Sequence, residues 1–157
     1  MAPNQAKLRL IWHGVFLFLL GLLSGAFVPI MTNPKAGLSA HLGGVLDGMF
    51  LMLLGLFWSE IRLSGRLETT TFWLMFYAAY AGWAGLLLAA FFGTSRATPI
   101  AGEGYVAAWW QESLVEVILI SFALAILIGC GLVLYGLRRK QSPGEPEVNR
   151  HTRHGVS

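Results

Sequence analysis

The chain has 157 residues and a formal net charge of +3, and 55% of its residues are hydrophobic while only 12% are charged. This composition excludes an ordinary soluble domain and is typical of a protein that resides in a lipid bilayer. No patch of basic residues is interleaved with aromatic residues, so we expect no nucleic-acid partner.

Four apolar runs predict membrane-spanning helices, since a helix needs about 20 mostly apolar residues to cross a hydrocarbon core of about 30 Å. The runs cover residues 10–31, 38–58, 72–92 and 114–137. The first run has no small-residue cleavage site, so we expect it to remain as a helix. The prediction is an all-α, integral-membrane four-helix bundle over residues 1–140, followed by a disordered polar tail over residues 141–157.

The orientation of the helices is predicted from the Lys and Arg residues near the ends of the spans. The N-terminus, the second connection and the C-terminal flank carry seven: Lys7, Arg9, Arg62, Arg66, Arg138, Arg139 and Lys140. The other two connections carry Lys35 and Arg96. Cytoplasmic loops are enriched in positive charge, so we expect both termini to be cytoplasmic and the protein to reside in the inner (cytoplasmic) membrane.

Small residues recur four positions apart, which lets helix backbones approach closely in lipid. The pairs are Gly21 and Gly25, Gly44 and Gly48, Ala78 and Gly82, and Ala81 and Gly85. These pairs predict close packing within the bundle. Since four helices alone bury little polar surface, we also expect an oligomer.

Two ionisable residues, His41 and Asp47, interrupt the second apolar run. His41 is expected about one turn inside the outer face, with Asp47 some 9 Å deeper, near the midplane. A charged carboxylate at the centre of a membrane helix costs roughly 2.5 to 3.5 kcal/mol. Asp47 should therefore face the bundle interior, pair with another group or be protonated.

For His41 two interpretations remain open: a hydrogen-bonded structural residue, or a ligand of a metal or haem iron. Glycines around it, Gly44 among them, would leave room for a flat cofactor. His13, at the cytoplasmic start of the first run, is interpreted as an interfacial or packing residue. Cys130 in the fourth run is interpreted as a small packed residue.

Acidic and aromatic residues on the third and fourth runs add further candidates. Glu112 and Glu116 lie four residues apart on one helix face, where like charges repel, and Arg96 is the candidate cation for them. Tyr77, Tyr80 and Trp83 are expected to form an aromatic face near the depth of Asp47. With Asp47 they would form an apolar pocket with a few polar groups, as is usual for a small-ligand site.

The stretches "WHGVFLFLLGLLSG" from Trp12 and "GLSAHLGGVLDGMFLMLLGL" from Gly37 resemble the hydroxylaminobenzene mutases, small integral-membrane isomerases of nitroaromatic degradation. The resemblance continues through "FWLMFYAAYAGWAGLLLAAF" and "WQES". More distantly, "AHLGGVLDGM" resembles the membrane-bound styrene oxide isomerases, in which the matching histidine ligates a haem b iron at a subunit interface of a trimer. This resemblance implies His41 as the axial haem ligand and a homotrimer as the assembly.

Two departures from the styrene oxide isomerases matter. Asp47 stands where they have Asn, and the catalytic tyrosine of their third helix has no match here. Tyr80 and Tyr77 are therefore assigned by depth, as residues that would orient the ring of a small aromatic substrate. Asp47 or Glu112, kept protonated by burial, would act as the acid and base.

The reaction implied by the mutase resemblance turns hydroxylaminobenzene into 2-aminophenol with no net redox change, so we expect no nicotinamide or flavin. In this interpretation a ferric haem b would act as a Lewis acid. Two alternatives remain at this point. One is an epoxide isomerase on the same scaffold, and the other is a non-enzymatic haem-carrying or transporter subunit.

Overall fold

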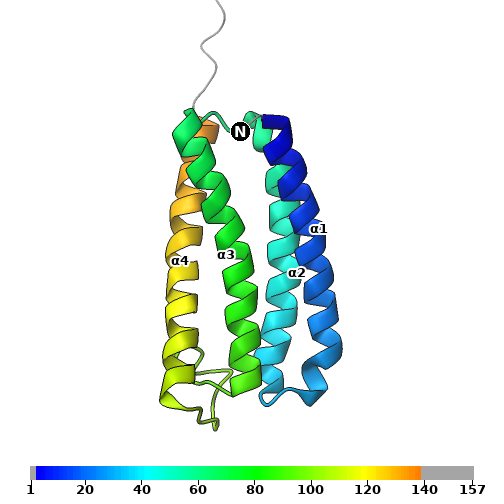
Figure 1. Ribbon diagram of the computed structural model, residues 1–157, viewed down its shortest axis with the longest axis vertical. Coiled ribbons are helices and arrows are strands. Elements are labelled where there is room, and N and C mark those ends of the chain that lie inside the picture. The colour runs from blue at the N-terminus through cyan, green and yellow to red at the C-terminus, as the bar shows by residue number, and fades with distance from the viewer. Residues whose placement is uncertain (1–2, 139–157) are drawn as a thin grey trace, which may run out of the picture.

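The computed structural model describes residues 3–138, and their regular structure is entirely helical. Four long helices follow one another along the chain (Figure 1): α1 Pro3–Phe27, α2 Pro34–Leu56, α3 Gly65–Phe92 and α4 Trp109–Arg138. Two short 3-10 turns, η1 Val28–Ile30 and η2 Trp58–Glu60, follow α1 and α2. By length and composition each of the four helices can cross a membrane. The predicted all-α membrane fold is confirmed.

All four helices begin before the predicted spans, whereas α1 and α2 end earlier than predicted, at Phe27 and Leu56. α1 begins at Pro3 and not near Leu10, and α3 begins at Gly65 and not near Phe72. A scan for apolar runs finds only the part of a helix that lipid would cover, whereas polar residues such as those at 69–71 continue the helix beyond it. The predicted tail over residues 141–157, together with Arg139 and Lys140, lies outside the described residues.

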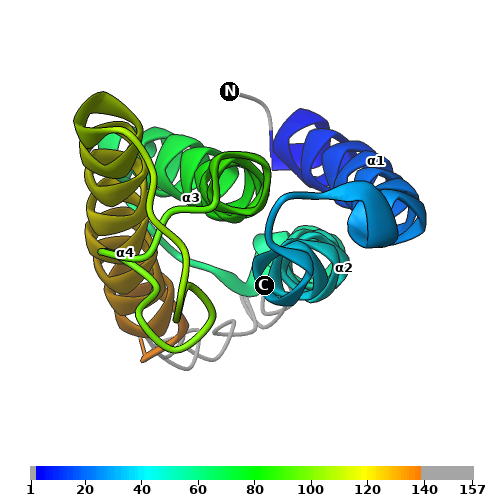
Figure 2. The same cartoon turned by 90° about the horizontal axis from the view of Figure 1, so that it is seen from below.

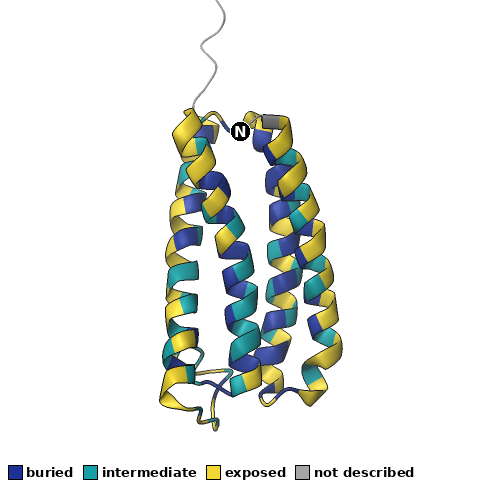
Figure 3. Cartoon of the chain, viewed as in Figure 1, coloured by how far each residue is buried: buried dark blue, intermediate teal, exposed yellow. Residues whose placement is uncertain are grey.

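The four helices pack side by side in chain order (Figures 1 and 2). α1 packs along α2, α2 along α3 and α3 along α4, while α4 packs chiefly against α3. We call the end where α1 begins and α4 ends the upper end, and the opposite end the lower end, as drawn in Figure 1. α4 carries the smallest share of buried residues among the four spans (Figure 3), so most of its surface faces outward.

Glycines bring the backbones of α1 and α2 into direct contact. A Cβ atom on Gly21 would lie 2.5 Å from the backbone nitrogen of Val45, and one on Gly48 would lie 2.5 Å from that of Phe18. No side chain fits at such distances, so this seam depends on glycine. On α3, Gly82 makes room for Phe122 of α4 in the same way. The predicted role of the small residues in helix packing is confirmed.

Asn33 and Gly93 organise the lower end. Gly93 ends α3 with φ +66°, a left-handed conformation that glycine adopts without strain. Asn33 is fully buried and caps α2, because its side-chain oxygen accepts a hydrogen bond from the Ala36 N–H at 3.1 Å. Its side-chain amide donates to the Ala101 carbonyl at 2.8 Å, and its backbone N–H donates to Ala90 at 2.9 Å. These bonds connect the α1–α2 turn to the end of α3 and to the segment that follows it.

Candidate functional site

His41 lies in the seam between α1 and α2, in the lower half of the bundle. Its Nδ1–H donates a hydrogen bond to the Gly21 carbonyl oxygen at 2.8 Å. The imidazole ring covers Gly25, where a Cβ atom would lie 2.6 Å from Nδ1. A proton on Nδ1 leaves the lone pair on Nε2 free. Metal-ligating histidines are commonly held in this way, with the other ring nitrogen donating to a backbone carbonyl.

Asp47 faces α3. A Cβ atom on Gly82 would lie 3.2 Å from Asp47 Oδ2 and 2.9 Å from Phe122 Cε2, which places the carboxyl group where α2 meets α3, close to α4. Within residues 3–138 this carboxyl group takes part in no ion pair and no side-chain hydrogen bond. The helix therefore places an acidic group without a protein partner in the middle of an apolar bundle, and such a group is available for proton transfer.

His41 and Asp47 do not converge within one chain. Six residues along a helix turn the side chain through about 600°, so the two point about 120° apart as well as some 9 Å apart along the axis. His41 contacts Gly21 and Gly25 of α1, whereas Asp47 lies beside Gly82 of α3. A single site that uses both would need elements from outside this one chain or a rearrangement of α2.

The aromatic residues of α3 contact three different helices. Tyr77 Oη lies 2.6 Å from Ser121 Oγ of α4, and Tyr80 Oη lies 3.0 Å from His13 Nδ1 of α1. Trp83 packs against Gly44 of α2, and its Nε1 is buried without a hydrogen-bond partner among the described residues. Residues three apart on a helix are rotated by about 60°, so this series spreads over about 120°. Tyr77 and Tyr80 share one side of α3, but Asp47 lies at the other side, so the expectation that this aromatic face lies beside Asp47 is wrong.

Gly44 makes room for neighbouring helices. A Cβ atom there would lie 2.6 Å from Trp83 Cδ1 and 2.7 Å from the Cα atom of Gly21. Both neighbours already fill the space that the missing side chain leaves. In this chain the glycine therefore serves helix packing, and the clearance expected for a flat cofactor is not present beside it.

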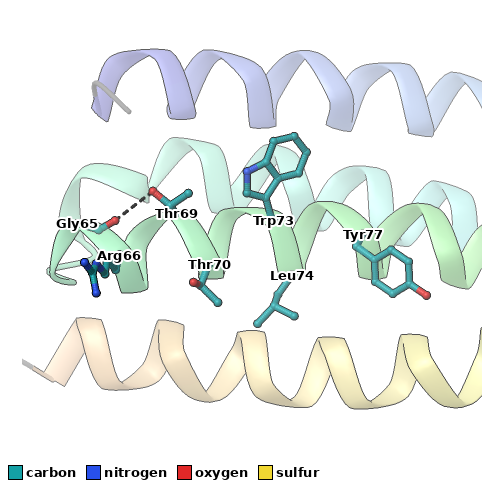
Figure 4. Close-up of a pocket in the computed structure, with 7 residues that line it drawn as sticks. All are labelled: Gly65, Arg66, Thr69, Thr70, Trp73, Leu74 and Tyr77. Carbon is teal, nitrogen blue, oxygen red and sulfur yellow. Dashed lines mark hydrogen bonds between the residues drawn. The ribbon is translucent and has the colours of Figure 1, made fainter.

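Tyr77 and Tyr80 instead line a groove on the outer surface of the bundle. This groove has a volume of about 490 Å³ and is formed by α3 with one residue of α4: Trp73, Phe76, Tyr77, Tyr80, Ala81, Ala84 and Ile118. A second hollow of about 680 Å³ continues from Trp73 and Tyr77 toward the upper end, where Arg66, Thr69 and Thr70 line it (Figure 4). We call the first of these the α3 groove. Its volume and its mainly apolar lining are within the range of small-ligand sites, and it is open along the outer surface of the bundle.

Glu112 is buried at the lower end, where it holds the segment after α3. Its carboxylate accepts hydrogen bonds from the backbone N–H groups of Ser95 at 3.0 Å and Arg96 at 2.9 Å. The Arg96 guanidinium forms an ion pair with Glu116 at 3.2 Å, so the predicted cation is confirmed. Because its oxygens already accept these bonds, Glu112 has the surroundings of a structural carboxylate. The structure places it in this loop network, away from the α3 groove.

His13 is the residue whose environment the sequence did not indicate. The imidazole packs edge-on against Phe76, with ring centroids 4.7 Å apart, and lies within hydrogen-bond distance of Tyr80. The predicted span started at Leu10 and placed His13 at a helix end. Because α1 starts at Pro3, His13 lies about 15 Å along the helix. Extending the helix upstream through Lys7 and Arg9 would have indicated this position.

Within residues 3–138 no three His, Cys, Asp or Glu side chains gather so that they could hold a metal ion. A haem iron needs only one or two axial protein ligands, so this finding bears on bare metal ions alone. His41, whose Nδ1–H donates to a backbone carbonyl oxygen, has the environment that is common for such a ligand.

The chain was compared with known proteins. A family model described as styrene oxide isomerase matches residues 6–138. The chain belongs to this family. Hydroxylaminobenzene mutase HabB of Ectopseudomonas oleovorans is 47% identical over 131 residues, which are 83% of this chain and 80% of that protein. Hydroxylaminobenzene mutase HabA of the same organism is 36% identical over 127 residues, which are 80% of this chain and 94% of that protein.

No solved structure matches the chain. The family and the two relatives identify this member of the styrene oxide isomerase family as a membrane isomerase. They favour the enzyme over the haem-carrying and transporter alternatives.

Proposed function

We propose that this isomerase converts arylhydroxylamines of the hydroxylaminobenzene type into 2-aminophenols. The observation that carries the proposal is the similarity to two proteins named hydroxylaminobenzene mutase, each over 80% or more of this chain. The reaction moves oxygen from nitrogen to the ortho carbon without net redox change. It therefore requires groups that move protons and stabilise charge during N–O cleavage, and it requires no nicotinamide or flavin.

We propose haem b as the cofactor, and His41 is the residue that would hold its iron. The supporting observation is the hydrogen bond from Nδ1–H to the Gly21 carbonyl, which leaves Nε2 free as an iron ligand. The absence of a side chain at Gly25 lets the ring settle in this orientation. When bound, a ferric haem would supply a Lewis acid for the hydroxylamine group.

Proton transfer is assigned to Asp47. Its carboxyl group lies inside the bundle without a protein hydrogen bond among the described residues. It is therefore free to give a proton to the hydroxylamine oxygen as the N–O bond breaks and to take one from the ring carbon after the C–O bond has formed, while the proton that the transferred oxygen releases goes to the nitrogen. Tyr77 and Tyr80 line the α3 groove, on the other side of α3 from Asp47, so in one chain they would bind an aromatic ring at a place separate from this carboxyl group. Glu112, the other acid considered, is engaged by the loop after α3 and is assigned a structural role.

A homo-oligomer, and by resemblance a trimer, would complete the site. His41 and Asp47 point to different neighbours within one chain, and α4 packs chiefly against α3 alone. Neighbouring copies in the bilayer would cover these outward surfaces and bring groups of different subunits together. We place the protein in the inner membrane with the upper end cytoplasmic. This end carries Lys7, Arg9, Arg62, Arg66 and Arg138, whereas the lower end carries Lys35 and Arg96.

Isomerisation of an epoxide such as styrene oxide is the second candidate, because the family model carries that description. Asp47 favours the first candidate, since it adds an acid and base group where the styrene oxide isomerases that the chain resembles have Asn. The two candidates therefore differ in the substrate that the site accepts.

The test is a comparison of kcat/KM for hydroxylaminobenzene and for styrene oxide with purified protein in lipid nanodiscs, without added nicotinamide. We expect 2-aminophenol to form, with kcat/KM for hydroxylaminobenzene at least about tenfold above that for styrene oxide. A preference for styrene oxide would assign the second candidate, and turnover of neither substrate would contradict both.

A further inference from the structure

His13 and Tyr80 form a polar contact between two helices that otherwise touch little. His13 Nδ1 lies 3.0 Å from Tyr80 Oη, and the phenol also lies 3.4 Å from the His13 carbonyl oxygen. Most packing in the bundle joins helices that follow one another in the chain, and α1 and α3 share only a small contact. Polar groups in the middle of an apolar bundle are costly, and such groups commonly mark a functional site.

The Tyr80 side chain is also part of the wall of the α3 groove. The neighbouring wall is aromatic, with Trp73, Phe76 and Tyr77, while Ala81 and Ala84 leave space for a planar molecule. Trp73 and Tyr77 are exposed on the outer surface of the bundle, so the groove opens toward the lipid. An apolar aromatic compound dissolved in the bilayer can reach it without passing through water.

Tyr80 is the member of the pair that lines the groove, and its hydroxyl group keeps hydrogen-bonding capacity for a ligand there. A phenol has one donor and two acceptor positions, and a neutral imidazole has one donor and one acceptor nitrogen. If the phenol donates to His13 Nδ1 or to the His13 carbonyl, its oxygen keeps a lone pair that can accept an N–H or O–H of the ligand. In the other arrangement His13 Nδ1–H donates to the phenol, and the phenol hydrogen is free for a ligand oxygen.

The α3 groove lies on the opposite side of α3 from Asp47. Tyr80 and Gly82, the residue beside the Asp47 carboxyl group, are two positions apart and therefore point about 200° apart around the helix. A ligand in the groove of one chain thus lies across α3 from the Asp47 carboxyl group of that chain. The groove is a binding site in its own right.

We propose that the His13–Tyr80 pair recognises the hydrogen-bonding nitrogen substituent of an aromatic amine or hydroxylamine whose ring lies in the α3 groove. Tyr80 contacts the ligand, and His13 is a positioning residue that holds the phenol. The site takes the substrate from the bilayer, and this assignment rests on the proposed arylhydroxylamine activity. Apolar aromatic compounds without such a substituent enter the groove but gain nothing from the pair.

The experiment uses three substitutions in the full chain in nanodiscs. Tyr80→Phe removes the phenol group, and His13→Phe removes its partner while keeping an aromatic ring against Phe76. His13→Asn keeps a polar atom near the position of Nδ1. The control Tyr135→Phe alters an exposed tyrosine near the upper end of α4, outside the groove. Thermal melting of each variant confirms that it is folded.

Two readouts follow: KM and kcat for hydroxylaminobenzene, and binding of 4-fluoroaniline and 4-fluorotoluene by fluorine NMR against empty nanodiscs. We expect Tyr80→Phe and His13→Phe each to raise KM about tenfold, the effect of losing one buried hydrogen bond, with kcat within about threefold. Both substitutions should weaken the binding of 4-fluoroaniline but not the binding of 4-fluorotoluene. The KM of His13→Asn should stay within about threefold of the wild-type KM. The KM of the variant with both Phe substitutions should be close to that of each single variant.

Two results would overturn the inference. In one, the folded Tyr80→Phe and His13→Phe variants bind 4-fluoroaniline as the wild type does. In the other, the variants lose affinity equally for both fluorinated ligands. This result is separate from the proposed function. If the wild-type protein makes no 2-aminophenol but the two variants lose the preference for 4-fluoroaniline, the arylhydroxylamine reaction is rejected and the amine site is kept. If both variants form 2-aminophenol normally and with unchanged KM, the reaction is kept and the amine site is rejected.

Discussion

The α1–α2 pair and the α3–α4 pair are built by different means. α1 and α2 are joined by a short turn and touch backbone to backbone through glycines. α3 and α4 are joined by the long segment 93–108, and they meet through side chains such as Phe122 against Gly82 and Met75 against Gly129. The first pair holds His41 against the Gly21 carbonyl, whereas the second carries the aromatic groove and the network around Glu112.

This difference would separate two tasks of the proposed isomerase. A histidine that holds a haem iron, as proposed for His41, would need a fixed position, and the glycine seam between α1 and α2 gives the His41 imidazole one. A site for small apolar molecules requires a lined hollow, and the aromatic side chains of α3, with Ile118 of α4, provide one on the outer surface. Asp47 lies between the two pairs, at the contact of α2 with α3.

The largest expected effect is at His41, and it tests whether the α1–α2 pair serves chemistry as well as packing. His41→Asn keeps an N–H that can donate to the Gly21 carbonyl but removes Nε2. We expect 2-aminophenol formation to fall by at least about 1,000-fold, because the Lewis acid would be lost. The Soret band of the purified protein should disappear while its melting temperature stays near that of the wild type. An active, red His41→Asn protein would contradict the assignment.

The next effect is at Asp47, between the pairs. Asp47→Asn keeps the size of the side chain but cannot donate or take up a proton as a carboxyl group does. We expect kcat for hydroxylaminobenzene to fall about 100-fold, the usual contribution of a general acid or base. Stability should not decrease, because a carboxyl group without a protein partner is removed from the apolar interior. Activity within threefold of the wild type would move proton transfer to another residue.

The packing of the α1–α2 pair is tested by Gly48→Ala. The added Cβ would lie 2.5 Å from the Phe18 nitrogen and 2.7 Å from the Gly14 carbonyl oxygen, so the two backbones must separate. We expect a loss of about 1 to 3 kcal/mol in the free energy of unfolding, measured by denaturation in mixed micelles. The matched control is Gly131→Ala on α4, where a Cβ meets nothing within 4 Å and should leave stability unchanged or slightly raised. Equal effects at the two glycines would refute the close seam.

The smallest expected effect concerns the α3–α4 pair. Glu112→Gln weakens the hydrogen bonds that hold the loop at Ser95 and Arg96, and we expect it to cost about 1 to 2 kcal/mol of unfolding free energy. Glu116→Gln removes only the half-exposed ion pair with Arg96 and should cost less than about 1 kcal/mol. Thermal melting of both variants measures the difference. If Glu116→Gln is the more damaging, the loop is held by the ion pair and not by Glu112.

Several features could be predicted from the sequence because they depend on properties local to one segment. Apolar runs indicated the four helices, small residues four apart indicated the close contacts of Gly21 and Gly48, and the repulsion between Glu112 and Glu116 indicated a cation, which is Arg96. Each of these inferences needed only spacing and composition.

The arrangement of the candidate site could not be predicted in the same way, because it depends on helix rotation and on true helix ends. Depth alone grouped Asp47 with Tyr77 and Tyr80, but the rotation of α2 and α3 turns them to different neighbours. The helix start at Pro3 moves His13 inward to Tyr80. The free Nε2 of His41 follows from one hydrogen bond to a carbonyl on another helix, which no sequence pattern marks.

The most direct test of the central claim is the product formed from hydroxylaminobenzene by the purified full chain in nanodiscs, with no nicotinamide or flavin added. We expect 2-aminophenol to accumulate in equal amount to the hydroxylaminobenzene consumed, at a rate proportional to the protein concentration, and we expect none from empty nanodiscs. Consumption no faster than in empty nanodiscs, or a 4-aminophenol product such as reaction with bulk water would give, would contradict it.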